Sequence, residues 1–172
     1  MKAMKHKNII AIFLVGLLTS CSSHDQTEER NKNSAEAFFR GVYGGDSSVV
    51  TEFGAEDIAL SYPIFQTLFN SPVIEGQKEI ENFIVRFSTK WKDQEITINE
   101  AIAEGNTVVL VWSFKARDAF YESGGPSDLG PNKSWGGITV YHFDEVGKIK
   151  SEFGEESEPG PYGRILTRES TN

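Results

Sequence analysis

Apolar and polar residues divide this chain into a helical first half and a β-rich second half. Apolar side chains over residues 35–42 recur at i, i+3, i+4 and i+7, which predicts an amphipathic helix that begins near Asn33 and ends at Gly44. The same spacing is clearest over residues 80–91. The pattern therefore predicts two long helices that each bury one face.

Shorter elements separate these two helices. Asp46 is placed to cap a short helix that reaches Phe53. Residues 57–62 alternate well enough for a short strand, which Pro63 would stop, and a loop rich in Phe, Asn and Pro then runs on to Gly76. The first half thus predicts three helices and one strand.

The second half has the pattern of a four-stranded meander. The expected strands cover residues 95–103, 107–117, 134–143 and 148–156. Turns over 104–106 and 144–147 contain glycines that tolerate positive φ and so favour hairpins. The long loop over 118–133 is a candidate lid or partner surface, and the tail over 158–172 is expected to be loose. Helices followed by strands indicate the α+β class, with one domain over residues 34–157.

A different pattern precedes this domain. Three lysines among the first seven residues are followed by an apolar run over 9–18, which is too short for a mature membrane-spanning helix of about 20 residues. Residues 1–20 therefore predict a signal peptide. Leu18 to Cys21 resemble the lipobox of bacterial lipoproteins, in which the cysteine takes a diacylglycerol and a signal peptidase cuts just before it. The alternative is an ordinary secretory signal followed by a chance cysteine.

Cys21 is the only cysteine of the 172 residues, and it stands where the lipobox requires one. We therefore expect lipidation at Cys21, a polar tether over 21–33 and a location in the cell envelope. Ser22 follows in place of the Asp that marks inner-membrane retention in some Gram-negative bacteria, which favours the outer membrane. With the one thiol acylated no disulfide can form, so the domain must be stable from its core alone.

The charge balance limits the partners. The chain carries a formal net charge of −8, and loss of the signal peptide would remove three lysines and no acidic residue. Nucleic acid is therefore excluded as a partner, and contact with a membrane is expected through the lipid alone. Among the three histidines only His142 lies within the domain, so neither a metal nor another cofactor is expected.

Several short motifs carry a family resemblance. They are Gly44-Gly45-Asp46 after the first helix, Gly76 leading the helix with Ile80 and Phe83, and Gly137 to Phe143 followed by Gly147-Lys148-Ile149. In this order they resemble the SnoaL-like branch of the nuclear-transport-factor-2-like superfamily over nearly all of residues 34–157. The resemblance implies a cone-shaped fold in which three helices and a strongly curved, mainly antiparallel sheet enclose one pocket. Members include ketosteroid isomerase, polyketide cyclases, epoxide hydrolases and modules that only bind or dimerise, so the fold does not settle the function.

The resemblance also locates the three places that serve ketosteroid isomerase. That enzyme uses an Asp base together with a Tyr and a protonated Asp. The corresponding positions of this chain hold Phe38, Tyr62 and Thr139. Phe38 has no proton-transfer group, Tyr62 is a poor base at neutral pH, and Thr139 is a weaker donor than a carboxylic acid. Steroid isomerisation by that route is therefore argued against.

Acidic residues on the last strand offer other chemistry. The period of two puts Glu152 and Glu156 on one face, and the resemblance places that face toward the pocket. A Glu in an apolar pocket has a raised pKa, so Glu152 is a candidate general acid or base, helped by Tyr62 or Tyr141. The alternative, which we favour because charge runs are usually solvated, is an acidic strand end that faces water.

Aromatic residues pose the same choice between a pocket and a core. Large aromatic side chains more often belong to the core. The candidate ligand-binding residues are Phe38, Trp112, Trp135, Thr139, Tyr141 and Glu156. His142 alternates with Tyr141 and is therefore expected on the surface.

Two functions remain open at this point. The first is a lipid-anchored pocket domain that binds a small, mostly apolar molecule, with or without isomerase-, cyclase- or lyase-like acid–base chemistry by Glu152 and Tyr62. The second is a non-catalytic tethered module that docks another envelope protein, or itself, through the outer face of the sheet. Homodimers are common among the proteins that the chain resembles. The sequence alone does not decide between enzyme and binder.

Overall fold

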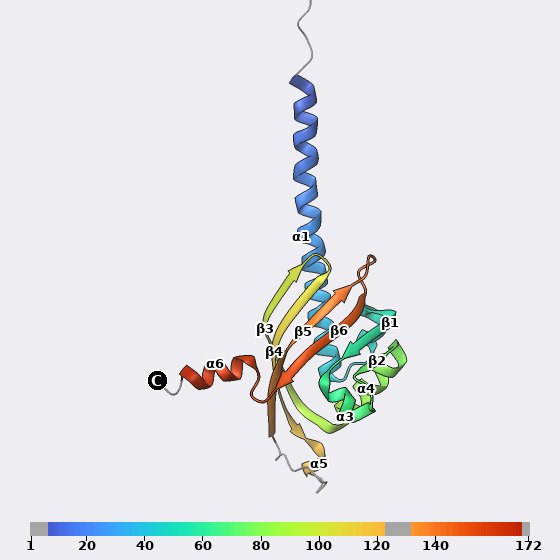
Figure 1. The fold of residues 1–172 in the computed structure, drawn as a ribbon, viewed down its shortest axis with the longest axis vertical. Coiled ribbons are helices and arrows are strands. Elements are labelled where there is room, and N and C mark those ends of the chain that lie inside the picture. The colour runs from blue at the N-terminus through green and yellow to red at the C-terminus, as the bar shows by residue number, and fades with distance from the viewer. Residues whose placement is uncertain (1–6, 123–131, 170–172) are drawn as a thin grey trace, which may run out of the picture.

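The computed structural model describes the backbone of residues 7–122 and 132–169. Helix α1 (Lys7–Gly44) projects from one end of a domain that is built on a curved sheet (Figure 1). Residues 1–6 of the expected signal peptide and 123–131 of the expected loop lie outside the described residues. Of the helices in the described residues, none is long and apolar enough to cross a membrane.

Helix α1 begins well before the expected start. The His24 imidazole lies 3.0 Å from the Glu28 carboxylate one turn later, a spacing that supports helix. The Glu28 carboxylate also accepts a hydrogen bond from the Gly105 amide (2.7 Å), and the buried Asn31 amide donates to the Gly105 carbonyl (3.3 Å). Residues 28–33 of the expected polar tether are therefore docked helix, held by contacts that local sequence does not reveal.

The end of α1 agrees with the prediction. The helix stops at Gly44, and Gly45 follows with φ of +86°, a left-handed conformation that commonly ends helices. The Asp46 carboxylate then accepts a hydrogen bond from the Ser48 amide (3.0 Å) at the start of α2 (Ser48–Phe53). The expected short helix with its Asp46 cap is confirmed.

Within the described residues, six strands form one mixed, curved sheet. They are β1 (Gly54–Ser61), β2 (Val73–Glu75), β3 (Trp91–Glu104), β4 (Thr107–Asp118), β5 (Asn132–Phe143) and β6 (Ile149–Ser157). Their order is β2-β1-β6-β5-β4-β3, and only the β1–β6 pair is parallel. The two predicted hairpins and the α+β class are confirmed, whereas the parallel pairing of β1 with β6 was not predicted.

The remaining helices differ from the prediction in three places. Helix α3 (Pro63–Phe69) stands where a loop was expected, with Pro63 in the first turn, where its missing N–H costs nothing. Helix α4 (Gln77–Lys90) is the predicted long helix. Short α5 (Ala119–Glu122) begins the region expected as a loop, and α6 (Pro161–Glu169) replaces the expected loose tail.

The core lies between the concave face of the sheet and the helices. Alternate residues of β4 over 108–116 are buried, as the period of two requires. The predicted stripe of α1 is buried against them, with Phe38 and Phe39 fully covered, and α4 contributes Ile80 and Ile84. Beside α3 and α4 this packing opens into a cavity.

Candidate functional site

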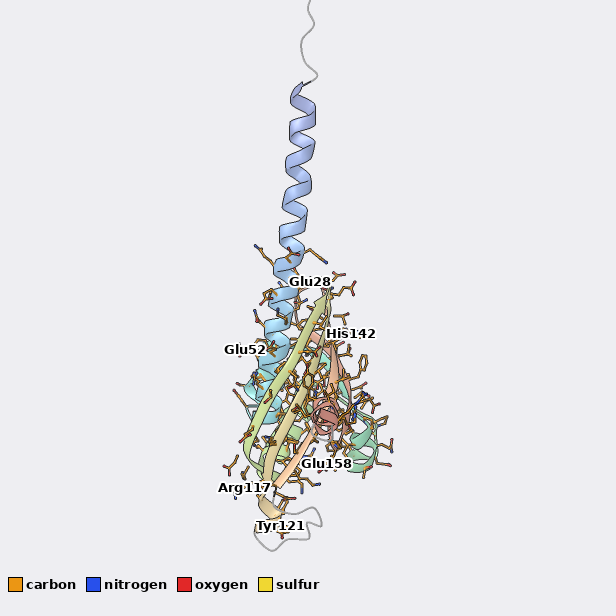
Figure 2. All side chains as sticks on the ribbon, turned by 90° about the vertical axis from the view of Figure 1, so that its left-hand side faces the viewer. Glu28, Glu52, Arg117, Tyr121, His142 and Glu158 are labelled. Carbon is orange, nitrogen blue, oxygen red and sulfur yellow. The ribbon has the colours of Figure 1, made fainter. Side chains whose placement is uncertain are left out.

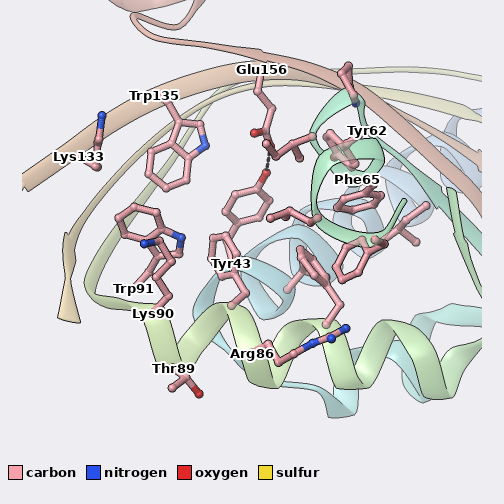
Figure 3. Close-up of a pocket in the computed structure, with 18 of the residues that line it drawn as sticks. Tyr43, Tyr62, Phe65, Arg86, Thr89, Lys90, Trp91, Lys133, Trp135 and Glu156 are labelled. Atoms are coloured by element: carbon pink, nitrogen blue, oxygen red, sulfur yellow. Dashed lines mark hydrogen bonds between the residues drawn. The ribbon is translucent and has the colours of Figure 1, made fainter. Parts of the chain in front are cut away.

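A cavity of about 850 Å³ lies between the concave face of the sheet and helices α3 and α4 (Figure 3). Its aromatic lining consists of Tyr43, Tyr62, Phe65, Phe69, Phe83, Phe87, Trp91, Phe120 and Trp135. The volume falls within the range of about 300–1,000 Å³ that is typical of small-molecule sites. Walls of this kind favour an apolar ligand.

Strand β6 places one carboxylate in the wall of this cavity. Glu152 is only 2% exposed. Burial raises the pKa of its carboxyl from an ordinary value of 4.5 to about 7, because the ionised form loses its hydration. A hydrogen bond donated by the Tyr62 hydroxyl opposes this rise, the charge of Glu156 adds to it, and a weaker interaction with the Tyr141 hydroxyl opposes it again. Glu152 therefore exists in both protonated and ionised forms near neutral pH.

A chain of hydrogen bonds ends on one oxygen of Glu152. The Trp112 indole N–H donates to Thr139 Oγ1 (2.9 Å), which lies 3.0 Å from the Tyr62 hydroxyl, and Tyr62 donates to Glu152 Oε1. An indole N–H is only a donor, and the Tyr62 proton is given to the carboxylate, so the Thr139 proton is directed at Tyr62. This series of hydrogen bonds therefore fixes the orientation of the Glu152 carboxyl group.

Gly154 makes this arrangement possible. It lies between the two glutamates of β6, and a Cβ atom there would come 2.7 Å from Tyr62 Cε1 and 3.0 Å from Thr139 Oγ1. Any side chain at this position would push Tyr62 away from Thr139 and Glu152. The glycine is thus required by close approach of the Tyr62 ring rather than by its backbone angles.

The other oxygen of Glu152, Oε2, has at most a weak interaction with the Tyr141 hydroxyl. Among the described residues, neither Glu152 Oε2 nor the Tyr141 hydroxyl has a well-formed hydrogen bond. Tyr141 stands directly opposite Glu152 in the β5–β6 register. Burial, together with the neighbouring charge of Glu152, raises the pKa of the Tyr141 phenol, which therefore keeps its proton. Glu152 lines the cavity and Tyr141 does not, so Oε2 of Glu152 is the acceptor that this part of the wall can offer to a ligand.

Glu156 is a second acidic group on the same face of β6. It accepts a hydrogen bond from the Tyr43 hydroxyl (2.5 Å), which the last turn of α1 supplies (Figure 3). Burial raises the pKa of Glu156, and burial together with the charge of Glu156 raises that of Tyr43. Within the described residues no group of three His, Cys, Asp or Glu side chains is placed to hold a metal ion.

The fold has counterparts among known proteins. Residues 35–152 match the model of the SnoaL-like domain. The chain belongs to this family. No match was found among curated proteins.

Solved structures share the SnoaL-like fold at low sequence identity. A proposed SnoaL-like polyketide cyclase from Shewanella denitrificans OS-217 has a TM-score of 0.60 and 13% identity, over 83% of this chain and 98% of that chain. An LEH-like epoxide hydrolase from M. tuberculosis has a TM-score of 0.57 and 14% identity, over 76% of this chain and 85% of that chain. TsrD from Streptomyces laurentii has a TM-score of 0.57 and 19% identity, over 76% of this chain and 90% of that chain. At these identities the similarity establishes the fold alone.

The SnoaL-like cavity gathers half of the residues predicted from the sequence. Tyr62, Trp135, Glu152 and Glu156 line it. The favoured alternative, a solvated acidic strand end, is wrong for Glu152, because the alternation of β6 turns this residue toward the concave face. The same alternation leaves Glu155 exposed.

The other candidates lie elsewhere. Phe38, Trp112, Thr139 and Tyr141 are fully buried and are not among the cavity-lining residues. Trp112 and Thr139 support Tyr62 from behind, which is a positioning role. Lipidation at Cys21 stays a prediction, because the residue lies in α1 but its side chain lies outside the described set.

Sequence reasoning missed several SnoaL-like cavity residues. Tyr43 follows the buried Phe39 by one helical turn, so the spacing of the first helix held a signal for it. Arg86, Lys90 and Lys133 also line the cavity, and nothing in the local pattern distinguishes them from surface residues. The last two are paired: Lys90 with Asp118 (2.8 Å) and Lys133 with Glu158 (2.9 Å).

Proposed function

We propose that the cavity binds a small, mostly apolar molecule and that Glu152 exchanges a proton with it. The observation that carries the proposal is the buried carboxylate of Glu152 in the wall of an aromatic cavity, held through Oε1 by Tyr62 and without a well-formed hydrogen bond on Oε2 from the described residues. A carboxyl group with a pKa of about 7 can give or take a proton at neutral pH at little cost.

Proton transfer beside a carbonyl group fits this arrangement. Ionised Glu152 would take a proton from the carbon next to the carbonyl through Oε2, and the electron pair of the broken C–H bond would move onto the carbonyl oxygen. Protonated Glu152 would then return the proton to another atom of the ligand. Isomerase-, cyclase- and lyase-like reactions share this first step. Tyr62 keeps its proton, because burial raises its pKa well above 10, so it positions Glu152 rather than acting as the base.

The experiment is a thermal-shift screen of the purified chain with apolar carbonyl compounds. Hits are then tested for exchange of the hydrogen next to the carbonyl with solvent deuterium. We expect Glu152→Gln to abolish exchange while preserving binding, and Glu155→Gln, an exposed neighbour on the same strand, to behave like the wild type. Unchanged exchange in Glu152→Gln would contradict the acid–base role, and the absence of any binder would contradict the pocket function.

We also propose that a lipid on Cys21 anchors the chain in the cell envelope, with the outer membrane favoured. The support is the lipobox-like sequence and the position of this single cysteine. The measurement is metabolic labelling with a fatty-acid analogue, followed by membrane fractionation. Cys21→Ala should lose the label and release the chain or leave an uncleaved precursor, whereas labelling that persists would refute the anchor.

A second candidate function, a non-catalytic docking or homodimerisation module, has support from the outer face of the sheet. The register aligns Ile102, Val109, Val140 and Phe153 across β3, β4, β5 and β6. Ile102 is 57% and Phe153 45% exposed, so this row is an apolar stripe open to a partner. Sedimentation of the wild type as a dimer, lost in Phe153→Lys but kept in Ser151→Lys on the same face, would support this function.

A further inference from the structure

We infer that the ligand of this cavity carries a hydroxyl group, which is held between the Trp135 indole and the Glu156 carboxylate. The inference rests on the proposed binding function. The Trp135–Glu156 pair would be a second polar contact for the ligand, in addition to Glu152. The class of expected ligands is then apolar alcohols and phenols.

The Trp135 indole offers a donor without an acceptor. Its ring lies against Phe114 (centroids 4.3 Å apart) and Trp91 (5.1 Å), so its orientation is fixed by packing. Trp135 lines the cavity, yet its Nε1 atom is buried without a hydrogen-bond partner in the described residues. An unpaired buried N–H is costly, and a native structure that retains one calls for an explanation. An acceptor on a ligand would satisfy it.

Glu156 offers an acceptor beside that donor. In the β5–β6 register Glu156 stands opposite Gly137, which makes Trp135 its diagonal neighbour on the same face. Diagonal neighbours have Cβ atoms about 7–8 Å apart or slightly less, which leaves room for one ligand group between their side chains. Figure 3 shows the indole nitrogen on the side of the ring that faces Glu156 and Tyr43. Tyr43 donates to Glu156 Oε1, and no described residue donates to Oε2.

A hydroxyl group is the chemistry that suits both neighbours. It accepts from the Trp135 N–H and donates to the Glu156 carboxylate at the same time. A ligand carboxylate would be repelled by Glu156, and an amine in its charged form would offer no acceptor to the indole N–H. A carbonyl would leave Glu156 Oε2 without a donor. The surrounding rings supply the apolar remainder of the site.

The experiment uses four naphthalene probes that differ at one position: 2-acetylnaphthalene, its 6-hydroxy and 6-methoxy derivatives, and 2,6-diacetylnaphthalene. Their dissociation constants for the full chain are measured by fluorescence titration at neutral pH. We expect the 6-hydroxy compound to bind about fivefold more tightly than the unsubstituted and methoxy compounds, which is the effect of one additional net hydrogen bond. Equal binding of all four, or preference for the diacetyl compound, would overturn the inference.

Two variants locate the effect. Trp135→Phe keeps an aromatic ring and removes the N–H, so the preference for the hydroxyl probe over the unsubstituted probe should disappear. Trp91→Phe, which alters the neighbouring indole, should affect all four probes alike. A hydroxyl preference that survives Trp135→Phe would also overturn the inference. Failure of every probe to bind the wild type would instead contradict the proposed pocket function, so the two failures are distinguishable.

Discussion

The two ends of this domain treat their buried polar groups in opposite ways. At the end where α1 enters, Asn31 and Glu28 satisfy both backbone groups of Gly105 at the tip of the β3–β4 hairpin. At the cavity end, Glu152 Oε2 and the Tyr141 hydroxyl lie buried without a well-formed hydrogen bond to any described residue. Figure 2 shows the length of the domain that separates Glu28, in α1, from Glu158, beside the cavity.

This contrast distinguishes polar groups that stabilise the fold from polar groups that are placed to bind a ligand. A buried polar group that the protein itself pairs contributes to stability, whereas an unpaired one costs free energy. The α1 end therefore has the arrangement of a docking contact between segments far apart in the sequence. The cavity end carries a cost that only a ligand or water can offset. A substitution at one end can therefore be compared with a matched substitution at the other end or at a neutral site.

The largest expected effect concerns the pH dependence contributed by Glu152. Its pKa is about 7 in the folded chain and 4.5 as its ordinary value. Between these values the folded chain binds more protons than the unfolded chain, so this group's contribution to stability falls as pH rises. That contribution is fully present below the lower pKa and lost above the higher one, an order-of-magnitude change of about 3 kcal/mol.

The measurement is chemical unfolding of the wild type and Glu152→Gln at about pH 4 and about pH 8. The variant cannot ionise, so its free energy of unfolding relative to the wild type should increase by roughly 3 kcal/mol across this interval. Glu155→Gln, at an exposed position of the same strand, should show no such trend. A constant difference between wild type and Glu152→Gln would show that the carboxyl is not perturbed by burial.

The second prediction tests the close packing behind the cavity. Gly154→Ala should lower the free energy of unfolding by about 2 kcal/mol, the usual cost of overpacking, because the new methyl group meets the Tyr62 ring and the Ile138 carbonyl. Gly44→Ala is the matched control, since a Cβ atom there has no neighbour within 4 Å. Equal stabilities of the two variants by urea unfolding would contradict the account of Gly154.

The residues around Glu152 show which features of the site could be predicted from the sequence and which could not. The alternation along β6 placed Glu152 and Glu156 on one face, and the 3.6-residue stripe of α4 was read correctly because both signals are local. Contacts such as Tyr43 with Glu156, 113 residues apart, depend on how α1 lies on the sheet. A pattern of neighbouring residues cannot predict a contact between residues so far apart in the sequence.

Errors at the segment level have the same origin. Helix α3 was missed because Pro63 was taken to end a strand, although it also begins a helix. The pairing of β1 with β6 was missed because parallel neighbours need no shared turn. The run of acidic residues near the end of β6 predicted a solvent-exposed strand end. The burial of Glu152 within it depends on how the helices pack on the sheet.

The third prediction concerns the α1 end. Asn31→Ala should lower the free energy of unfolding by about 1 kcal/mol, because the Gly105 carbonyl loses its buried donor. Asn33→Ala, an exposed asparagine two residues later, should change stability by less than about 0.5 kcal/mol. Increased hydrogen exchange at the β3–β4 turn should accompany the first change only. If both variants matched the wild type, α1 would not be docked through Asn31 in solution.

The smallest effect is expected where a hydroxyl has no partner to lose. Tyr141→Phe removes a buried O–H that makes no well-formed hydrogen bond to the described residues, so stability should change by less than about 1 kcal/mol and in the stabilising direction. Tyr62→Phe is the same substitution at a hydroxyl bonded to both Thr139 and Glu152, and it should be clearly destabilising. Denaturant unfolding of both variants without ligand gives the comparison. Equal losses would mean that the Tyr141 hydroxyl is paired in the free protein, and Glu152 Oε2, the nearest acceptor, would then no longer be open to a ligand.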